Sequence, residues 1–76
     1  MTDHETFAQR LARLREAAGL TRYAAAKAAG ISAIGYTRYE TRGVVPSLPA
    51  AERLAAALGV TLAELAGCHW PTKWDD

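Results

Sequence analysis

Four basic side chains lie close together in the sequence and have the chemistry to bind phosphates or base edges. Between residues 20 and 43 the chain has four basic residues and one acidic residue, which are Arg22, Lys27, Arg38, Arg42 and Glu40. This stretch has a net charge of +3 in a chain whose total net charge is +1. An arginine guanidinium forms paired hydrogen bonds with a phosphate or with the O6 and N7 atoms of guanine. The pattern indicates a surface for a nucleic acid, although it is equally typical of a solvated helix surface.

Other residues with reactive side chains do not have the spacing that catalysis or metal binding needs. Cys68, His69 and His4 are the candidate metal ligands, but they lack the paired spacing of a zinc site. A nucleophilic pair of Cys68 and His69 has no third residue to orient it. The sequence also has no paired carboxylates and no glycine-rich cofactor loop. We therefore expect no metal, no cofactor and no enzymatic activity.

Length and composition predict one small globular domain. Half of the 76 residues are hydrophobic, too many for a disordered chain, and the length suits a single domain. No apolar run approaches the ~20 residues that cross a bilayer, and the polar start has no secretory signal. The only cysteine, Cys68, permits no internal disulfide, which suits a reducing compartment. We expect a cytoplasmic protein that does not bind a membrane.

Apolar spacing and capping residues predict three helices in the first half of the chain. A capping box at Thr2 and Glu5 opens the first helix, which Gly19 ends. Its apolar face recurs at helical spacing and consists of Phe7, Leu11, Leu14 and Ala18. Thr21 caps a second helix that runs to Ala29, and Ser32 caps a third helix from Ala33 to about Thr41. Gly30 separates these two helices.

The second half of the chain predicts two more helices and no strand. Ser47 caps a fourth helix that Gly59 closes, with a buried stripe of Leu48, Ala51, Leu54, Ala55 and Leu58. Thr61 and Glu64 form a capping box for a short fifth helix that ends near Ala66. The expected fold is an all-α, compact bundle of five helices over residues 1–66. Residues 67–76 form a tail without periodicity, in which Trp70 and Trp74 either pack over the domain or make a dimer or partner contact.

The two helices within residues 21–41 have the pattern of a helix-turn-helix unit. They are joined by a short turn at Gly30, as this unit requires. The second helix is rich in alanine, and the small side chains of Ala25, Ala26 and Ala29 let the third helix cross it closely. The third helix then protrudes far enough to enter a DNA major groove, which is about 12 Å wide.

Five blocks of sequence resemble the Cro/C1-type (XRE) helix-turn-helix family in order and spacing. The blocks are residues 14–21, 26–32, 38–40, 46–48 and 54–60. The resemblance implies a lambda repressor-like DNA-binding fold and transcriptional repression by a dimer on a palindromic site. It also implies a partly buried ion pair between Arg15 and Glu40. The chain departs from the family at Arg22, where glutamine is usual, and at Ala33 and Ile34, where polar base readers are usual.

Helical geometry divides the third helix into two faces. Tyr36 and Tyr39 are expected to face the core, and Gly35 to make room for Tyr39 or for the second helix. The predicted base-reading residues are on the other face and comprise Arg38, Thr37, Ile34 and Ala33, with Thr41 beside them. Arg38 is expected to read guanine, with a phosphate contact or a free surface charge as the alternatives. Ile34 and Ala33 are expected to meet thymine methyl groups, and the alternative for Ile34 is an isolated exposed apolar residue or part of a protein contact. The predicted phosphate-binding residues are Arg22, Thr21, Ser32, Arg42, Tyr23 and Lys27.

These patterns lead to two hypotheses about function. The first is a sequence-preferring transcriptional regulator of phage or bacterial type, a repressor that binds double-stranded DNA as a homodimer. The alternative is a protein-interaction module, antitoxin-like or repressor-modulating, that keeps the bundle and reads DNA weakly or not at all. The alternative draws on the apolar Ala33 and Ile34 at the start of the third helix, the near-neutral total charge and the tail that contains Trp70 and Trp74. Arg38→Ala distinguishes them, because it removes DNA binding in the first case only.

Overall fold

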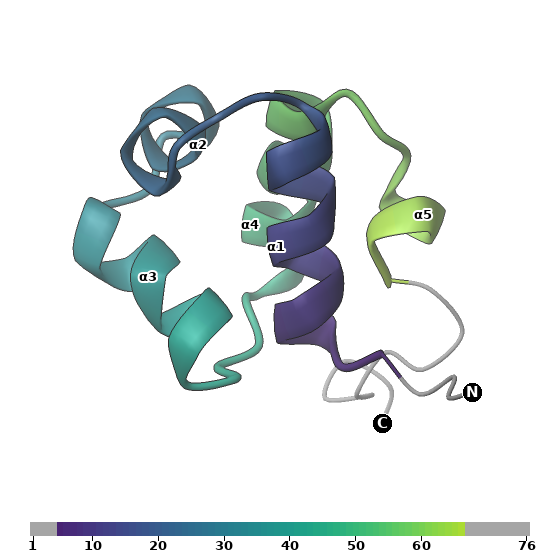
Figure 1. Ribbon diagram of the computed structural model, residues 1–76, viewed down its shortest axis with the longest axis horizontal. Coiled ribbons are helices and arrows are strands. Elements are labelled where there is room, and N and C mark those ends of the chain that lie inside the picture. The colour runs from purple at the N-terminus through teal and green to yellow at the C-terminus, as the bar shows by residue number, and fades with distance from the viewer. Residues whose placement is uncertain (1–4, 67–76) are drawn as a thin grey trace.

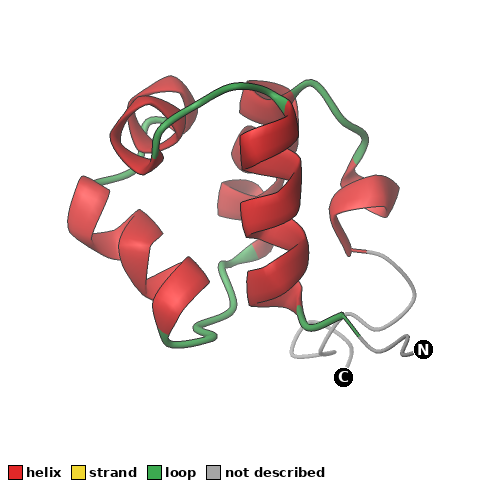
Figure 2. Cartoon of the chain, in the orientation of Figure 1, coloured by secondary structure: helices red, strands yellow, loops and turns green. Residues whose placement is uncertain are grey.

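Residues 5–66, the part of the chain that the computed structural model describes, form five helices and no strand (Figure 2). The helices are α1 (Phe7–Ala17), α2 (Arg22–Ala29), α3 (Ala33–Thr41), α4 (Leu48–Leu58) and α5 (Leu62–Ala66). In Figure 1, α1 runs through the middle of the bundle, with α2 and α3 on one side and α5 on the other. The predicted all-α fold is confirmed. The predicted tail, with Trp70 and Trp74, lies outside the described residues.

Side-chain caps fix where most of these helices begin. Thr21, Ser32 and Ser47 each accept a hydrogen bond from the backbone amide three residues later, at 3.0, 3.0 and 3.3 Å. Before α5, Thr61 and Glu64 form both hydrogen bonds of the predicted capping box. Each cap satisfies an amide that has no partner inside its helix, so the local sequence sets the boundary.

The predicted start of α1 is wrong. The N-cap is Thr6, whose Oγ1 accepts from the Gln9 amide at 3.1 Å, while Gln9 Oε1 accepts from the Thr6 amide at 2.9 Å. Glutamine serves in a capping box as well as glutamate does. Glu5 precedes the helix instead, and its carboxylate accepts from Arg13 Nε at 2.7 Å. Thr2, the predicted cap, lies outside the described residues.

The core combines small and large apolar side chains. Leucines and aromatics from four helices surround the alanines of α2 and α4, and the buried set includes Phe7, Leu11, Tyr36, Leu54, Leu58, Leu65, Ala25, Ala26, Ala29, Ala51 and Ala55. The alanines let α2 pack closely, and it contacts both α3 and α4. Arg53 on α4 also donates from Nε to the Ala29 carbonyl at 3.2 Å, which ties α4 to the end of α2.

One residue of the predicted α4 stripe is not buried. Leu48 is 38% exposed, whereas the other predicted stripe residues of α4 are buried. Leu48 is the first residue of α4 and lies at the edge of the bundle, where the buried side chain is that of Pro46. The periodicity therefore identified the correct face but extended it one turn too far.

Candidate nucleic-acid interface

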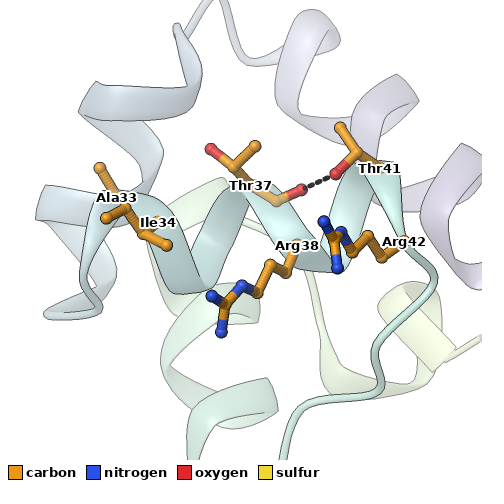
Figure 3. A pocket seen from close by; sticks show the side chains of 6 residues that line it. All are labelled: Ala33, Ile34, Thr37, Arg38, Thr41 and Arg42. Atoms are coloured by element: carbon orange, nitrogen blue, oxygen red, sulfur yellow. Dashed lines mark hydrogen bonds between the residues drawn. The ribbon is translucent and has the colours of Figure 1, made fainter.

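One side of α3 lines a shallow hollow of about 420 Å³. We call this side the outer face of α3, and its residues are Ala33, Ile34, Thr37, Arg38, Thr41 and Arg42 (Figure 3). These residues form two rows at four-residue spacing, because positions four apart lie above one another on a helix. All four predicted base readers belong to the outer face, and Thr37 alone is half-buried.

The outer face of α3 changes from apolar to cationic along the helix. Ile34, in the first turn, is 69% exposed. The guanidinium groups of Arg38 and Arg42 project from the same side of the helix (Figure 3). Within residues 5–66, the side chains of these two arginines make no ion pair or hydrogen bond. Both cations are therefore available to a ligand.

The two threonines of the outer face lie between its apolar and cationic ends. Thr41 Oγ1 donates to the Thr37 carbonyl at 2.9 Å, so the Thr41 hydroxyl proton is directed to its own helix (Figure 3). The Thr41 oxygen remains able to accept. Thr37 makes no side-chain hydrogen bond with the described residues, and its hydroxyl can donate or accept.

The predicted phosphate-binding residues divide into capping residues and exposed side chains. The hydroxyls of Thr21 and Ser32 are used as N-caps of α2 and α3. Tyr23 and Lys27 are exposed on α2, and neither has a side-chain partner among the described residues. The amides at the start of α2 and the nearby cations suit an anion, since a helix N-terminus carries partial positive charge.

Glu40, on the inner side of α3, accepts from three different side chains. Arg15 Nε donates to its carboxylate at 2.7 Å and Arg22 Nε at 3.1 Å, and the Tyr36 hydroxyl donates as well. Arg15 also donates from Nη1 to the Leu20 carbonyl at 2.7 Å. The side chains of Arg15 and Glu40 are only 12% and 2% exposed. The ion pair implied by the family resemblance is present, within what we call the Glu40 cluster (Glu40, Arg15, Arg22 and Tyr36).

Hydrogen bonds keep the Glu40 cluster in one protonation state at neutral pH. Burial on its own would raise the pKa of Glu40, but hydrogen bonds from Arg15 and Tyr36 hold that pKa below its usual value. Burial, followed by the hydrogen bond to Glu40, raises the pKa of Tyr36. Glu40 is therefore ionised and Tyr36 protonated, which is the pairing that the hydrogen bond between them requires.

Two members of the Glu40 cluster were missed by sequence reasoning. Arg22 was predicted only as a phosphate ligand and Tyr36 only as an apolar core residue. The spacing of Tyr36 and Glu40, four residues apart on one helix, was a signal for their contact. Arg22 is 49% exposed, and its Nη groups make no hydrogen bond with the described residues. Arg22 can therefore contact Glu40 and a ligand at the same time.

The predicted role of Gly35 is wrong. A Cβ atom at Gly35 would lie 2.9 Å from Ser32 Oγ and 3.7 Å from Ile31 Cγ2, and it would meet neither Tyr39 nor α2. Tyr39 instead packs edge-on against Tyr36, with ring centroids 6.3 Å apart. The space at Gly35 is thus occupied by the residue that caps the same helix.

No group of three potential metal ligands gathers among residues 5–66, and the candidate ligands His4, Cys68 and His69 lie outside that range. In the same range no helix has the length and apolar character needed to cross a bilayer.

Comparison with known proteins identifies relatives in sequence and in fold. A family model described as a helix-turn-helix domain matches residues 6–67. The restriction-modification controller protein C.AhdI from Aeromonas hydrophila is 34% identical, with 78% of this chain and 89% of that chain covered and a TM-score of 0.74. The N-terminal DNA-binding domain of SinR from Bacillus subtilis is 25% identical, with coverages of 82% and 91% and a TM-score of 0.73.

A third structure extends the likeness in fold. The DNA-binding domain of the P22 C2 repressor has a TM-score of 0.79 at 17% identity, with 92% of both chains covered. No curated protein matches the chain. The family match spans nearly all of the described residues, including both helices of the predicted helix-turn-helix unit. The chain therefore belongs to the helix-turn-helix domain family and is of the Cro/C1 type.

Proposed function

We propose that this protein is a transcriptional regulator that binds double-stranded DNA by placing the outer face of α3 in the major groove. The observation that carries the proposal is that Arg38 and Arg42, beside the exposed Ile34, have no side-chain partner within residues 5–66. The names of two similar proteins, a restriction-modification controller and the DNA-binding domain of SinR, support the same function. A helix of this kind fits a groove about 12 Å wide.

Each part of the surface has a role in this mechanism. Arg38 binds guanine through O6 and N7, and Thr37 contacts a neighbouring base or phosphate. Arg42 and Lys27 bind phosphates, as does Arg22 through its Nη groups. The residues at the helix starts, Thr21, Tyr23 and Ser32, flank backbone amides that point toward the same phosphates. Phosphate contacts thus fix the position of α3, and its side chains select the sequence.

The proposal extends to the state in which the protein acts. Few residues of one subunit read bases, so useful affinity requires a homodimer on a palindromic site or tandem sites. We propose repression, in which the bound dimer blocks access of the polymerase to the promoter. Binding alone accounts for this action, and no catalysed reaction is part of it. The cytoplasm, where bacterial DNA lies, is the compartment that this function implies.

Selection of bound sequences from random duplexes, at a stated salt concentration, tests the proposal directly. We expect one enriched half-site, repeated at a spacing that reports the dimer. Affinity should fall with salt at a slope of about −0.9 per phosphate neutralised. A flat salt response with no enriched sequence would reject DNA binding and favour the alternative of a protein-interaction module.

The selected duplex then allows a test of Arg38. We expect Arg38→Ala to weaken binding roughly 5- to 150-fold, the range for one paired contact of about 1–3 kcal/mol. Arg13→Ala is the matched control, because it also removes one positive charge but lies on α1, paired with Glu5. Equal effects of the two variants would show that Arg38 contributes only charge.

A further inference from the structure

Ile34 is exposed for no reason that the fold provides. Among the described residues it is the most exposed large hydrophobic side chain, at 69%. An isoleucine on a helix surface gains neither burial energy nor helix propensity over alanine. Its neighbours Ala33 and Gly35 have no polar side chain either, so the side chains on both sides of Ile34 add no hydrogen bond to a ligand.

The surroundings of Ile34 indicate which partner covers it. Ile34, Arg38 and Arg42 follow one another at four-residue spacing and line the same hollow. A partner that buries Ile34 therefore also meets two guanidinium groups that no side chain in the described part of the chain pairs with. An apolar protein surface would remove those cations from water without compensation, which is costly. The DNA major groove offers phosphates and guanine acceptors for the cations, and methyl groups for the isoleucine.

Resting on the proposed function, we propose that Ile34 recognises the 5-methyl group of a pyrimidine in the operator. Thymine presents this methyl in the major groove, and 5-methylcytosine presents the same group in methylated DNA. The Cα atoms of Ile34 and Arg38 are four residues apart, or about 6 Å along the helix axis. The methylated pyrimidine therefore lies within about two base pairs of the guanine that Arg38 reads, since base pairs are spaced about 3.4 Å apart. Specificity at this position comes from burial of a methyl group and needs no hydrogen bond.

Single replacement of each operator thymine by uracil tests this inference, because the change removes one methyl group and leaves base pairing intact. We expect one position at which uracil weakens binding about fourfold, equivalent to about 0.8 kcal/mol for one buried methyl group. The effect should vanish in Ile34→Ala, whose thymine and uracil duplexes should bind equally. Leu48→Ala removes another exposed leucine-sized side chain outside the hollow and should keep the fourfold difference. Melting curves verify that both variants are folded.

Placing cytosine and 5-methylcytosine at the sensitive position distinguishes the two sources of the methyl group. A fourfold preference for 5-methylcytosine over cytosine supports recognition of the methyl on either base, and its absence restricts the recognition to thymine. A uracil scan that is flat, or identical in wild type and Ile34→Ala, overturns the inference. That result leaves the proposed function standing, because an enriched sequence and a steep salt response are measured separately.

Discussion

The inner side of α3 pairs its charged side chain within the fold, whereas the outer side has charged side chains without a partner among the described residues. On the inner side, Glu40 has three donors around it and Tyr36 is fully buried. On the outer side, Ile34 is exposed, and Arg38 and Arg42 have no side-chain partner among the described residues. Helical periodicity places these sets on opposite sides of only nine residues. The residues that stabilise the fold and those proposed to recognise DNA therefore lie on opposite sides of one helix, although they alternate along its sequence.

Arg22 connects the two regions. Its Nε donates to Glu40, and its Nη groups make no hydrogen bond with the described residues. Glutamine is the usual family residue here, and it has no positive charge. The substitution adds a cation at the start of α2 and fixes it through a buried carboxylate. A charge held in one geometry loses less conformational entropy on binding than a free side chain does.

The largest expected effect comes from removing the inner carboxylate. Glu40→Ala leaves the nearly buried Arg15 without its partner, so we expect a loss of about 3–5 kcal/mol in the free energy of unfolding. Urea unfolding followed by circular dichroism measures this loss. Arg38→Ala, on the other side of the same helix, should change stability by less than about 0.5 kcal/mol. Equal destabilisation by the two variants would contradict the division of α3 into two faces.

A smaller loss is expected from removing one donor of the Glu40 cluster. Tyr36→Phe keeps the buried ring and deletes the hydroxyl, and a hydrogen bond to a charged group contributes about 1.5–3 kcal/mol. The same unfolding experiment measures the change. The control is Tyr23→Phe, because the Tyr23 hydroxyl has no partner among the described residues. If Tyr36→Phe were as stable as wild type, the hydroxyl would contribute nothing to the Glu40 cluster.

Acid should weaken the inner side and leave the outer side unchanged. Because folding lowers the pKa of Glu40, the folded protein binds fewer protons than the unfolded chain near the ordinary value of 4.5. The stabilisation is complete above that value and is lost as the pH falls through the folded pKa. Glu40→Gln removes this titration, so its stability should fall less steeply with acid than that of the wild type. Parallel curves for the two proteins would show that Glu40 has an ordinary pKa.

Most local features of the fold were predictable from the sequence, whereas the long-range contact of Arg22 with Glu40 was not, and the Arg15–Glu40 pair was expected only from the family resemblance. Thr21, Ser32 and Ser47 cap their helices as predicted, because a cap bonds only to the amide three residues later. Helical spacing likewise predicted which side of α3 is exposed. The contact of Arg22 with Glu40 joins residues 18 apart, and it depends on how α2 crosses α3. No pattern within either helix specifies that crossing.

Two wrong predictions have opposite origins. Leu48 fits the apolar spacing of α4, but spacing does not show where the core ends, and Leu48 is 38% exposed. Gly35 was assigned to a tertiary contact, but its nearest neighbour is the cap of its own helix. At Leu48 the apolar spacing described α4 alone, whereas the burial of the side chain depended on how the helices pack. At Gly35 the prediction assumed a packing contact between helices, whereas the contact found is within α3 and its own cap.

The smallest expected effect is at Gly35, which lies between the two sides of α3. A Cβ there meets Ser32 Oγ at 2.9 Å, so the hydroxyl must shift by a few tenths of an ångström. The equivalent positions of α2 and α4 are Ala24 and Ala50, and their caps accommodate a Cβ with hydrogen bonds of 3.0 and 3.3 Å. Alanine in a helix is favoured over glycine by up to about 1 kcal/mol. We therefore expect Gly35→Ala to stabilise the protein by about 0.5 kcal/mol, measured by thermal melting.

The control for this substitution is Gly30→Ala. Gly30 has a φ of 72°, a left-handed conformation that costs an L-residue about 1–2 kcal/mol, so this variant should be less stable than wild type. If Gly35→Ala stabilises the protein and Gly30→Ala destabilises it, then Gly35 is needed neither for a left-handed backbone conformation nor for space in the core. A loss of stability in Gly35→Ala would mean that the Ser32 cap cannot shift. Because Ser32 begins the helix that bears Ile34 and Arg38, DNA affinity should then fall together with stability.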